Sequence, residues 1–370
     1  MCLEESSLRY DERIAAALRE LYGNYGYGRF KMGKFEEYEL YVRNKDFLTG
    51  DKMITFTDGD GTLLALKPDV TISIIKNTQE GDNGARKVYY HENVYRTGRG
   101  ESSFREIMQT GLECIGDLDA YQVFEVILLA VKSLEVISPD YMLDLSHMGL
   151  VSGIMEQAGV PEAQYTRVLS AVREKNPTEL LDFCREEKLS EASCKLLQLL
   201  LTTYGNRKAV LEALGPYCTE GQAKLAYEEL QVLDQLLSVS GLGDRVQIDF
   251  SLVNDMGYYN GIVFQGFIKG LADGVLSGGR YDKLVEKMGK NFGAIGFAIT
   301  LNELERLKPK SRDYDADVLL LYDEGTDLVE LTQKSAELLE QGLQIMVQRG
   351  SPQRIRCRET LDLRRGGEAQ

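Results

Sequence analysis

The sequence has few of the residues from which metal sites, disulfide frameworks and membrane spans are built. It contains two histidines, His91 and His147, and six cysteines without a CxxC spacing, so a Cys/His metal site is not expected. Neither histidine has a catalytic partner by spacing, which favours structural roles. No apolar run approaches ~18 residues, and no basic start with an apolar stretch opens the chain. The sequence therefore predicts neither a membrane span nor a signal peptide, and reduced thiols in the cytoplasm explain the cysteines.

Basic residues are also few compared with acidic ones. Lysine and arginine together number 43, aspartate and glutamate 58, and the net charge is −15. Nucleic-acid affinity depends on many Lys/Arg–phosphate contacts, so a large polyphosphate-binding surface is not expected. An acidic excess also keeps a protein soluble, and on charge alone this simpler interpretation stays open. With 370 residues and 43% apolar content, the chain is long enough for two or three packed domains.

Hydrophobic periodicity and turn residues indicate strands on both sides of a helical block. The turn at 58–61 (DGDG) is a hairpin signal between two short strands, and Pro68 ends the second of them. The expected helices are 8–25, 70–76 and 120–136, and the expected strands are 54–57, 62–66, 87–96, 106–115, 246–250 and 261–267.

Strand signals vanish between 149 and 243, where Leu, Glu, Ala and Lys dominate, which indicates a helical insertion. From 315 the pattern is strand, helix, strand, at 318–322, 328–341 and 344–347, and a polar tail follows. We therefore predict an α+β fold whose core is an antiparallel sheet. The predicted parts are a discontinuous core at 1–148 and 244–308, a helical insertion at 149–243, and a partial α/β segment with a polar tail at 315–370.

The turn at 66–71 (LKPDVT) carries two polar side chains at the start of a helix. Pro68 fixes the turn. The Asp69 carboxylate and the Thr71 hydroxyl, two residues apart, can both reach an ammonium group of a ligand, by charge pairing and hydrogen bonding. The alternative is an ordinary helix cap formed by an aspartate and a threonine.

The strand expected at 106–115 has polar side chains on one face. Arg105, Gln109, Gly111 and Glu113 share that face because strand side chains alternate. Such a face can bind a ligand, with Gly111 leaving room for it. It can also be a solvated polar face, which is the usual case for alternating strands.

Three tyrosines are further candidates for the same pocket. Tyr258 and Tyr259 are adjacent, so on a strand they point to opposite faces and only one can line the pocket; we expect this to be Tyr259. Tyr281 follows Gly278 and Gly279, which let the backbone come close to a ligand.

Together these segments resemble histidyl-tRNA synthetases, a family of class II aminoacyl-tRNA synthetases. The turn at 66–71 is similar to the family's Leu-Arg-Pro-Glu-Gly-Thr, and the run 94–116 is similar to its motif 2. The runs 254–264 (NDMGYYNGIVF) and 277–282 (SGGRYD) resemble its histidine-specific signature, and 293–304 resembles its motif 3. The thirteen-residue match at 104–116 favours the ligand-binding interpretation of that strand. The resemblance implies a class II synthetase-like sheet core, a helical insertion and a truncated, anticodon-binding-like C-terminal α/β unit.

The departures from the synthetases fall on the ATP or activation side. The motif 2 glutamate two residues after the arginine, which pairs with ATP in the synthetases, is Gly98; the signature arginine is Asn254, and the motif 3 arginine is Glu303. A carboxylate at the last position repels a triphosphate. The positions on the histidine side largely remain. In this pattern the chain is similar to the synthetase-like regulatory subunits of ATP phosphoribosyltransferase, the first enzyme of histidine biosynthesis.

That resemblance implies a regulatory subunit with no catalytic residues, no metal and no cofactor, whose effector ligand is histidine. Its implied partners are a short-form catalytic subunit and a second copy in a class II-type dimer, in the cytoplasm, without tRNA or a membrane. The alternatives are a divergent histidyl-tRNA synthetase and another histidine-sensing synthetase paralogue. Arg96 and Arg105 are the candidates for the histidine carboxylate, in place of the missing arginine. The implied histidine-binding residues are Asp69, Thr71, Arg96, Arg105, Gln109, Glu113, Tyr258, Tyr259 and Tyr281.

Overall fold

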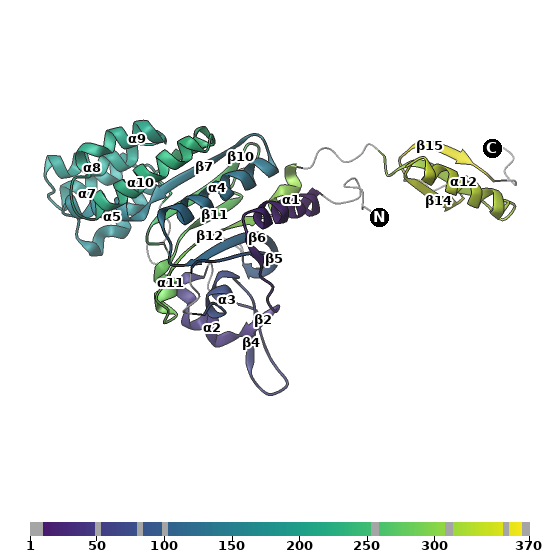
Figure 1. Cartoon of the computed structure of the whole chain (residues 1–370), viewed down its shortest axis with the longest axis horizontal. Coiled ribbons are helices and arrows are strands. Elements are labelled where there is room, and N and C mark those ends of the chain that lie inside the picture. Colours follow the sequence, from purple (N-terminus) through teal and green to yellow (C-terminus); the bar gives the residue numbers. More distant parts are fainter. Residues whose placement is uncertain are drawn as a thin grey trace. The chain divides into compact units, whose positions relative to one another are not determined.

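A computed structural model of the chain describes residues 10–48, 53–79, 84–97, 103–252, 259–307, 314–350 and 355–364. The chain divides into two units, 1–307 and 308–370 (Figure 1). The described part of the first unit has two sheets and two apolar cores, and that of the second unit has one sheet with a small core.

The large sheet of the first unit has nine strands within the described residues. Neighbouring strands pair antiparallel, except that β1 with β5 and β7 with β9 are parallel. The predicted α+β fold with an antiparallel sheet core is therefore confirmed. Across the sheet the strands are β1 (Gly28–Arg29), β5 (Arg86–Thr97), β6 (Phe104–Gly116), β12 (Gly293–Thr300), β11 (Leu276–Arg280), β10 (Ile262–Ile268), β7 (Tyr141–His147), β9 (Val246–Ile248) and β8 (Gly205–Asn206).

Two long helices, α1 (Tyr10–Asn24) and α4 (Ala120–Ile137), pack on one face of this sheet (Figure 1). The Asp119 side chain begins α4 by accepting hydrogen bonds from backbone N–H groups in its first turn, as an N-cap does. Tyr22 of α1 is buried against the sheet, where its ring meets Phe297 edge-on at 6.2 Å between centroids, and its hydroxyl lies 2.9 Å from Ser133 Oγ of α4. Apolar burial on this face holds the sheet and both helices together.

In the described part of the chain, short elements pack against the opposite face. A three-stranded sheet, in the order β2 (Phe35–Glu37), β4 (Leu63–Leu66) and β3 (Thr55–Thr57), joins three helices there, and their apolar side chains form a second core with the strands. The hairpin of β3 and β4 was predicted from its turn and is confirmed. The helices are α2 (Tyr38–Arg43), α3 (Thr71–Lys76) and α11 (Asp282–Lys287), with a 3-10 turn at Lys45–Phe47. Polar side chains lie between these elements and the sheet.

Residues between β7 and β9 are almost entirely helical, as the composition predicts. The division of the first unit into core and insertion stays a prediction. Asparagine or serine side chains cap α7, α8 and α9, and Pro177 occupies the first turn of α7. The helices are α5 (Met148–Gln157), α6 (Tyr165–Arg173), α7 (Pro177–Glu186), α8 (Glu191–Thr202), α9 (Arg207–Leu214) and α10 (Gly221–Val239), with 3-10 turns at Glu162–Gln164, Gly215–Tyr217 and Gly243–Arg245.

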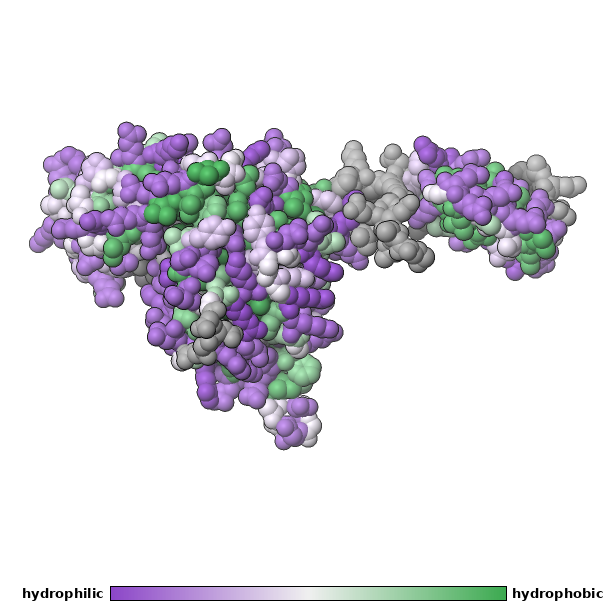
Figure 2. All heavy atoms as spheres, viewed as in Figure 1, coloured by the Kyte–Doolittle hydropathy of each residue, from purple (hydrophilic) through white to green (hydrophobic). Residues whose placement is uncertain are grey.

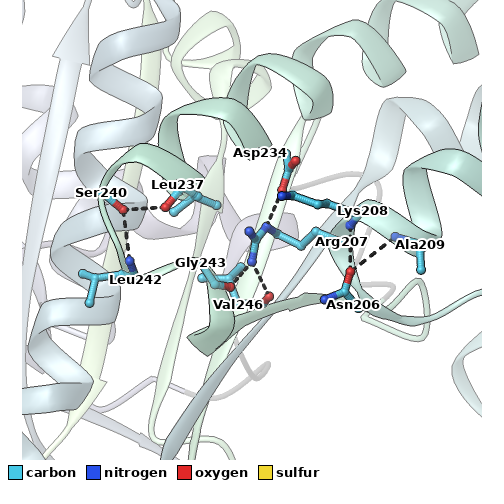
Figure 3. Close-up of polar contacts among 10 residues, drawn as sticks. All are labelled: Asn206, Arg207, Lys208, Ala209, Asp234, Leu237, Ser240, Leu242, Gly243 and Val246. Carbon is cyan, nitrogen blue, oxygen red and sulfur yellow. Dashed lines mark hydrogen bonds and ion pairs between the residues drawn. The ribbon is translucent and has the colours of Figure 1, made fainter.

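A buried arginine joins these helices to the returning strand (Figure 3). Arg207 opens α9, and its Nε donates to Asp234 Oδ1 of α10 at 2.8 Å. Its Nη1 donates to the carbonyl oxygens of Gly243 and of Val246, the first residue of β9, the latter at 2.8 Å. Because the arginine is buried, these partners replace water for its guanidinium. One side chain thereby fixes α9, α10 and β9 to one another.

The second unit is a small parallel sheet with one helix, formed by β13 (Ala316–Tyr322), α12 (Leu328–Glu340), β14 (Ile345–Arg349) and β15 (Cys357–Asp362). The strands lie in the order β14-β13-β15, and both neighbours run parallel to β13. The strand–helix–strand prediction is confirmed. The prediction of only a polar tail after it was wrong at Cys357–Asp362, because an edge strand needs backbone hydrogen bonds more than an apolar side-chain pattern.

In the view of Figure 2, hydrophilic residues cover most of the surface, and hydrophobic ones gather in smaller areas near α4 and α10. No helix in the described ranges has the length and the apolar content that crossing a bilayer requires. β7, an inner strand of the large sheet, was not predicted. Nor were β1, β2 and α2, which are too short for a periodic pattern.

Candidate functional site

Glu113 lies at the centre of a buried polar cluster on the face of the sheet that the short elements cover. It stands on β6 and is 2% exposed. The Thr71 hydroxyl at the start of α3 donates to Glu113 Oε1 at 2.7 Å, and the Tyr281 hydroxyl, just after β11, donates to Oε2 at 2.5 Å. We call Asp69, Thr71, Glu113, Tyr259 and Tyr281 the polar cluster.

The space for the Glu113 carboxylate is provided by a glycine on the neighbouring strand. Gly296 of β12 pairs with Glu113, so both residues point to the same face. A Cβ atom at residue 296 would lie 1.6 Å from Glu113 Oε2. Gly296, in the segment that resembles motif 3, therefore leaves room for the carboxylate of Glu113, in the segment that resembles motif 2.

Burial changes the ionisation of this carboxylate. It raises the pKa of Glu113 to about 8, more than the hydrogen bonds from Tyr281 and Thr71 lower it, and nearby Asp69 raises it further. Glu113 is therefore mostly neutral at pH 7, and a ligand that brings a positive charge would favour its ionised form.

Asp69 belongs to the same cluster and also stabilises the start of α3. Its Oδ1 accepts a hydrogen bond from the backbone N–H of Ile72 at 3.0 Å, so the capping interpretation holds for this residue. Burial raises the pKa of Asp69, and the Ile72 N–H and the positive charge of Arg96 oppose that rise. Arg96 thus acts electrostatically on the cluster from the far part of β5.

Gln109 and Arg105 follow Glu113 along β6 toward its start, on the same face. Gln109 is buried, whereas Arg105 is exposed at the other end of the strand, eight residues from Glu113. That separation is ~27 Å along an extended strand. Gln109 is thus nearer to Glu113 along the strand than Arg105, and Arg105 lies opposite Arg96 of β5. A place for Gln109 or Arg105 in the pocket stays a prediction.

Tyr90 is a member of this site that the sequence analysis missed. It pairs with Gly111, and a Cβ at residue 111 would lie 2.7 Å from its hydroxyl oxygen. The room above Gly111 therefore holds the Tyr90 phenol rather than open space for a ligand. Burial and the nearby carboxyl groups of Glu113 and Asp69 raise the pKa of Tyr90 well above its usual range. Its position opposite a glycine on the paired strand was the available signal.

Tyr259 lies near the two carboxyl groups of the cluster, and the choice between it and Tyr258 stays a prediction. Its ring lies over Gly279 of β11, where a Cβ atom would be 2.6 Å from the ring Cδ1. Burial raises the pKa of Tyr259, and the proximity of Glu113 and Asp69 raises it further. Three further positions of the sequence analysis lie outside the described residues, namely Gly98, Asn254 and Tyr258, as does the side chain of Glu303.

The cluster brings together hydroxyl and carboxyl oxygens from four separate segments; Thr71, Glu113 and Tyr281 are buried, and Asp69 and Tyr259 are half-buried. Both carboxyl groups have pKa values raised by burial, so a ligand with N–H donors and a positive charge fits them electrostatically. Within the residues that the structure describes, no group of three or more Asp, Glu, His and Cys side chains is arranged to hold a metal ion. His147 caps α5 through its Nδ1, which accepts from the backbone N–H of Leu150, as expected of a structural histidine.

Comparison with known proteins identifies the family. Residues 3–304 match the family model of histidyl-tRNA synthetase. The chain is 29% identical over 346 residues to an ATP phosphoribosyltransferase regulatory subunit from Clostridium kluyveri, covering 90% of this chain and 87% of that protein. A protein of the same name from Bacillus cereus is 26% identical over 322 residues, covering 84% and 76%.

A solved structure from Bacillus halodurans agrees with these relatives in sequence and in fold. It is described as an ATP phosphoribosyltransferase regulatory subunit/histidyl-tRNA synthetase, is 25% identical, and has a TM-score of 0.78, with 97% of this chain and 95% of that chain covered. The family match extends over most of the large-sheet unit and its helices. The chain therefore belongs to the histidyl-tRNA synthetase family, and its relatives include ATP phosphoribosyltransferase regulatory subunits.

Proposed function

We propose that this protein is the non-catalytic regulatory subunit of an ATP phosphoribosyltransferase, required for the first step of histidine biosynthesis and mediating feedback by histidine. The observation that supports this most directly is the polar cluster around Glu113, a buried set of acceptors and hydroxyl groups suited to an amino acid with a basic side chain. The names of the relatives support the same role. The protein needs no cofactor of its own in this role.

The proposed ligand is free histidine, bound in the polar cluster. The Glu113 carboxylate accepts from the imidazole N–H, and Asp69 and Thr71 receive the α-ammonium group, since charge-assisted hydrogen bonds are strongest where water is excluded. Gln109 and Tyr259 contribute further polar contacts. Arg96 is a better candidate than Arg105 for the histidine carboxylate, because its charge already acts on Asp69.

Regulation follows if the complex of this chain with its partner has two arrangements and histidine binds one of them more tightly than the other. The proposed partner is a short-form ATP phosphoribosyltransferase catalytic subunit, and the regulatory subunit pairs with a second copy in a class II-type dimer. Histidine favours one arrangement and thereby lowers the partner's activity, with a coupling free energy of about 1–3 kcal/mol. The same coupling requires that the partner's state changes the affinity for histidine.

The test mixes the purified chain with a short-form catalytic subunit and measures phosphoribosyl transfer with and without histidine. We expect the chain to be required for full activity and histidine to inhibit the mixture. Glu113→Gln should keep the stimulation but weaken histidine inhibition about tenfold. The matched control is Glu106→Gln, which changes an exposed glutamate on the same strand. Histidine should inhibit the mixture with this variant as strongly as the mixture with the unchanged chain.

Two results would overturn the proposal. The first is a mixture whose activity is the same without this chain. The second is exchange of pyrophosphate into ATP in the presence of histidine, which would show amino-acid activation and favour the divergent synthetase instead.

A further inference from the structure

A second polar network, beside the polar cluster, joins the residue after Tyr259 to the start of α11. The backbone N–H of Asn260 donates to the carbonyl oxygen of Arg280 at 3.1 Å. The Asn260 amide Nδ2 donates to Asp282 Oδ2 at 3.1 Å, and the backbone N–H of Asp282 donates to Asn260 Oδ1 at 2.9 Å. Three hydrogen bonds therefore hold Asn260 against the segment 280–282.

Asp282 is itself fixed from two other directions. Its Oδ1 accepts from the backbone N–H of Ala294, in β12, at 2.9 Å. Its Oδ2 accepts from Arg280 Nε at 2.8 Å, with the arginine 28% and the aspartate 16% exposed. The carboxylate thus joins β12, the end of β11 and Asn260. A part-buried, charge-assisted network of this kind restricts the groups that form it.

This network lies one residue from the contact between Tyr259 and Gly279. Asn260 follows Tyr259, and Arg280 follows Gly279, so the bonds between 260 and 280–282 set how closely the tyrosine ring approaches the glycine. The aliphatic part of Arg280 also packs on Gly261, where a Cβ atom would lie 3.1 Å from its Cδ. The residues that follow Tyr259 and Gly279, on the two sides of this contact, therefore both bind the Asp282 carboxylate.

We propose that Asn260 and Asp282 are positioning residues of the ligand site, which hold Tyr259 over Gly279 in the orientation that receives the ligand. The inference rests on the proposed function, because it assigns an indirect part in histidine binding. Asp282 does not contact the ligand; its two carboxylate oxygens already accept from Ala294, Arg280 and Asn260. Its effect on affinity passes through Tyr259.

A double-mutant cycle separates this indirect effect from a general loss of stability. Calorimetric titration with histidine is compared for the unchanged chain, Asp282→Asn, Tyr259→Ala and the double variant. Asp282→Asn places an NH2 group against the donors of Asn260 and Arg280, so we expect the Kd to rise about tenfold. In the Tyr259→Ala background the same change should alter the Kd less than about twofold. Equal effects in both backgrounds would refute the inference.

A second measurement does not need a ligand. Asp282→Asn should speed amide hydrogen exchange at Asn260 and in the first residues of β10, because the side-chain bonds that hold Asn260 against Asp282 are weakened and the segment opens more often. Asn260→Ala should do the same, which keeps the test usable if the first variant does not fold. Unchanged exchange in a folded variant contradicts the inference. The control is Asp140→Asn, since that carboxylate is exposed and pairs loosely with Lys269 at 3.8 Å.

A double variant, Asn260→Asp with Asp282→Asn, exchanges the two side chains and so places a donor opposite an acceptor again. It should recover part of the affinity for histidine that Asp282→Asn alone loses. No recovery, together with independent effects in the cycle, assigns Asp282 a merely structural part. If the unchanged chain does not bind histidine while Asp282→Asn still loosens the segment at Asn260, the proposed ligand is wrong and the positioning stands.

Discussion

Glu113 and Gly296 face each other across β6 and β12, and the carboxylate of the first occupies the place where a side chain of the second would begin. A Cβ atom at residue 296 would lie 1.6 Å from Glu113 Oε2 and 2.5 Å from the carbonyl oxygen of Leu112. The buried carboxyl and the glycine therefore depend on each other. Adding a single methyl group at residue 296 should therefore displace the Glu113 carboxylate.

Gly296→Ala should displace the Glu113 carboxylate and weaken its hydrogen bonds from Thr71 and Tyr281. Because the backbone of a central strand cannot move away, we expect the free energy of unfolding to fall by about 1–3 kcal/mol. Urea denaturation followed by circular dichroism measures it. The control is Gly23→Ala in α1, where a Cβ atom meets no atom within 4 Å; because alanine favours a helix over glycine by up to about 1 kcal/mol, this change should not lower the free energy of unfolding. Equal stability of the two variants would contradict the packing described.

The raised pKa of Glu113 makes the stability of the protein depend on pH. Its pKa is about 8 in the folded chain against an ordinary value of 4.5, so the folded state holds a proton that the unfolded state releases between these values. The contribution is complete below pH 4.5 and is lost as the pH rises through about 8. The free energy of unfolding should therefore fall more steeply over this range in the unchanged chain than in Glu113→Gln, which cannot ionise.

The measurement is a series of urea denaturations across that pH range. Asp69, which raises the pKa of Glu113, titrates in both chains, so the difference between the two curves reports Glu113 together with its interaction with Asp69. Glu106→Gln, on the exposed part of the same strand, should follow the unchanged chain. Parallel curves for the Glu113→Gln variant and the unchanged chain would show that Glu113 is ionised in the folded state at neutral pH.

Thr71→Val should remove the donor to Glu113 Oε1 while keeping the shape of the side chain. The carboxyl then keeps one hydrogen bond, from Tyr281, and we expect the affinity for histidine to fall about tenfold. Thr71→Ser retains the hydroxyl and should restore most of the affinity. Isothermal titration of both variants checks this, and equal weakening by serine and valine would mean that the methyl group, not the hydroxyl, matters.

Arg207→Met should lower the free energy of unfolding, because it leaves the half-buried Asp234 without its cation and two carbonyl oxygens without their donor (Figure 3). Removing one partner of a buried ion pair costs about 3–5 kcal/mol. The double variant Arg207→Met with Asp234→Leu should recover part of this loss. Chemical denaturation compares them with Arg185→Met, whose pair with Asp182 is exposed and should contribute less than about 1 kcal/mol. A loss of unfolding free energy no larger than that of Arg185→Met would mean that the contacts of Arg207 do not stabilise the fold.

Those residues of the candidate site that match motifs of the family could be predicted from the sequence. Asp69, Thr71, Glu113, Tyr259 and Tyr281 come together as expected. The parts of Arg105 and Gln109 stay predictions, because alternation along a strand shows which face a residue shares but not how far along that face it lies. Tyr90 was missed for the converse reason, since its place above Gly111 depends on the register between two strands.

The sequence by itself determined the kinds of elements, the hairpin turn and the helical block, because periodicity and turn chemistry are local properties of the chain. Only the tertiary structure decided that Glu113 meets Thr71, 42 residues away, and Tyr281, 168 residues away. It also decided that Glu113 is buried, and burial is what raises its pKa. Strand order and register are set by packing between distant segments, and no local pattern contains them.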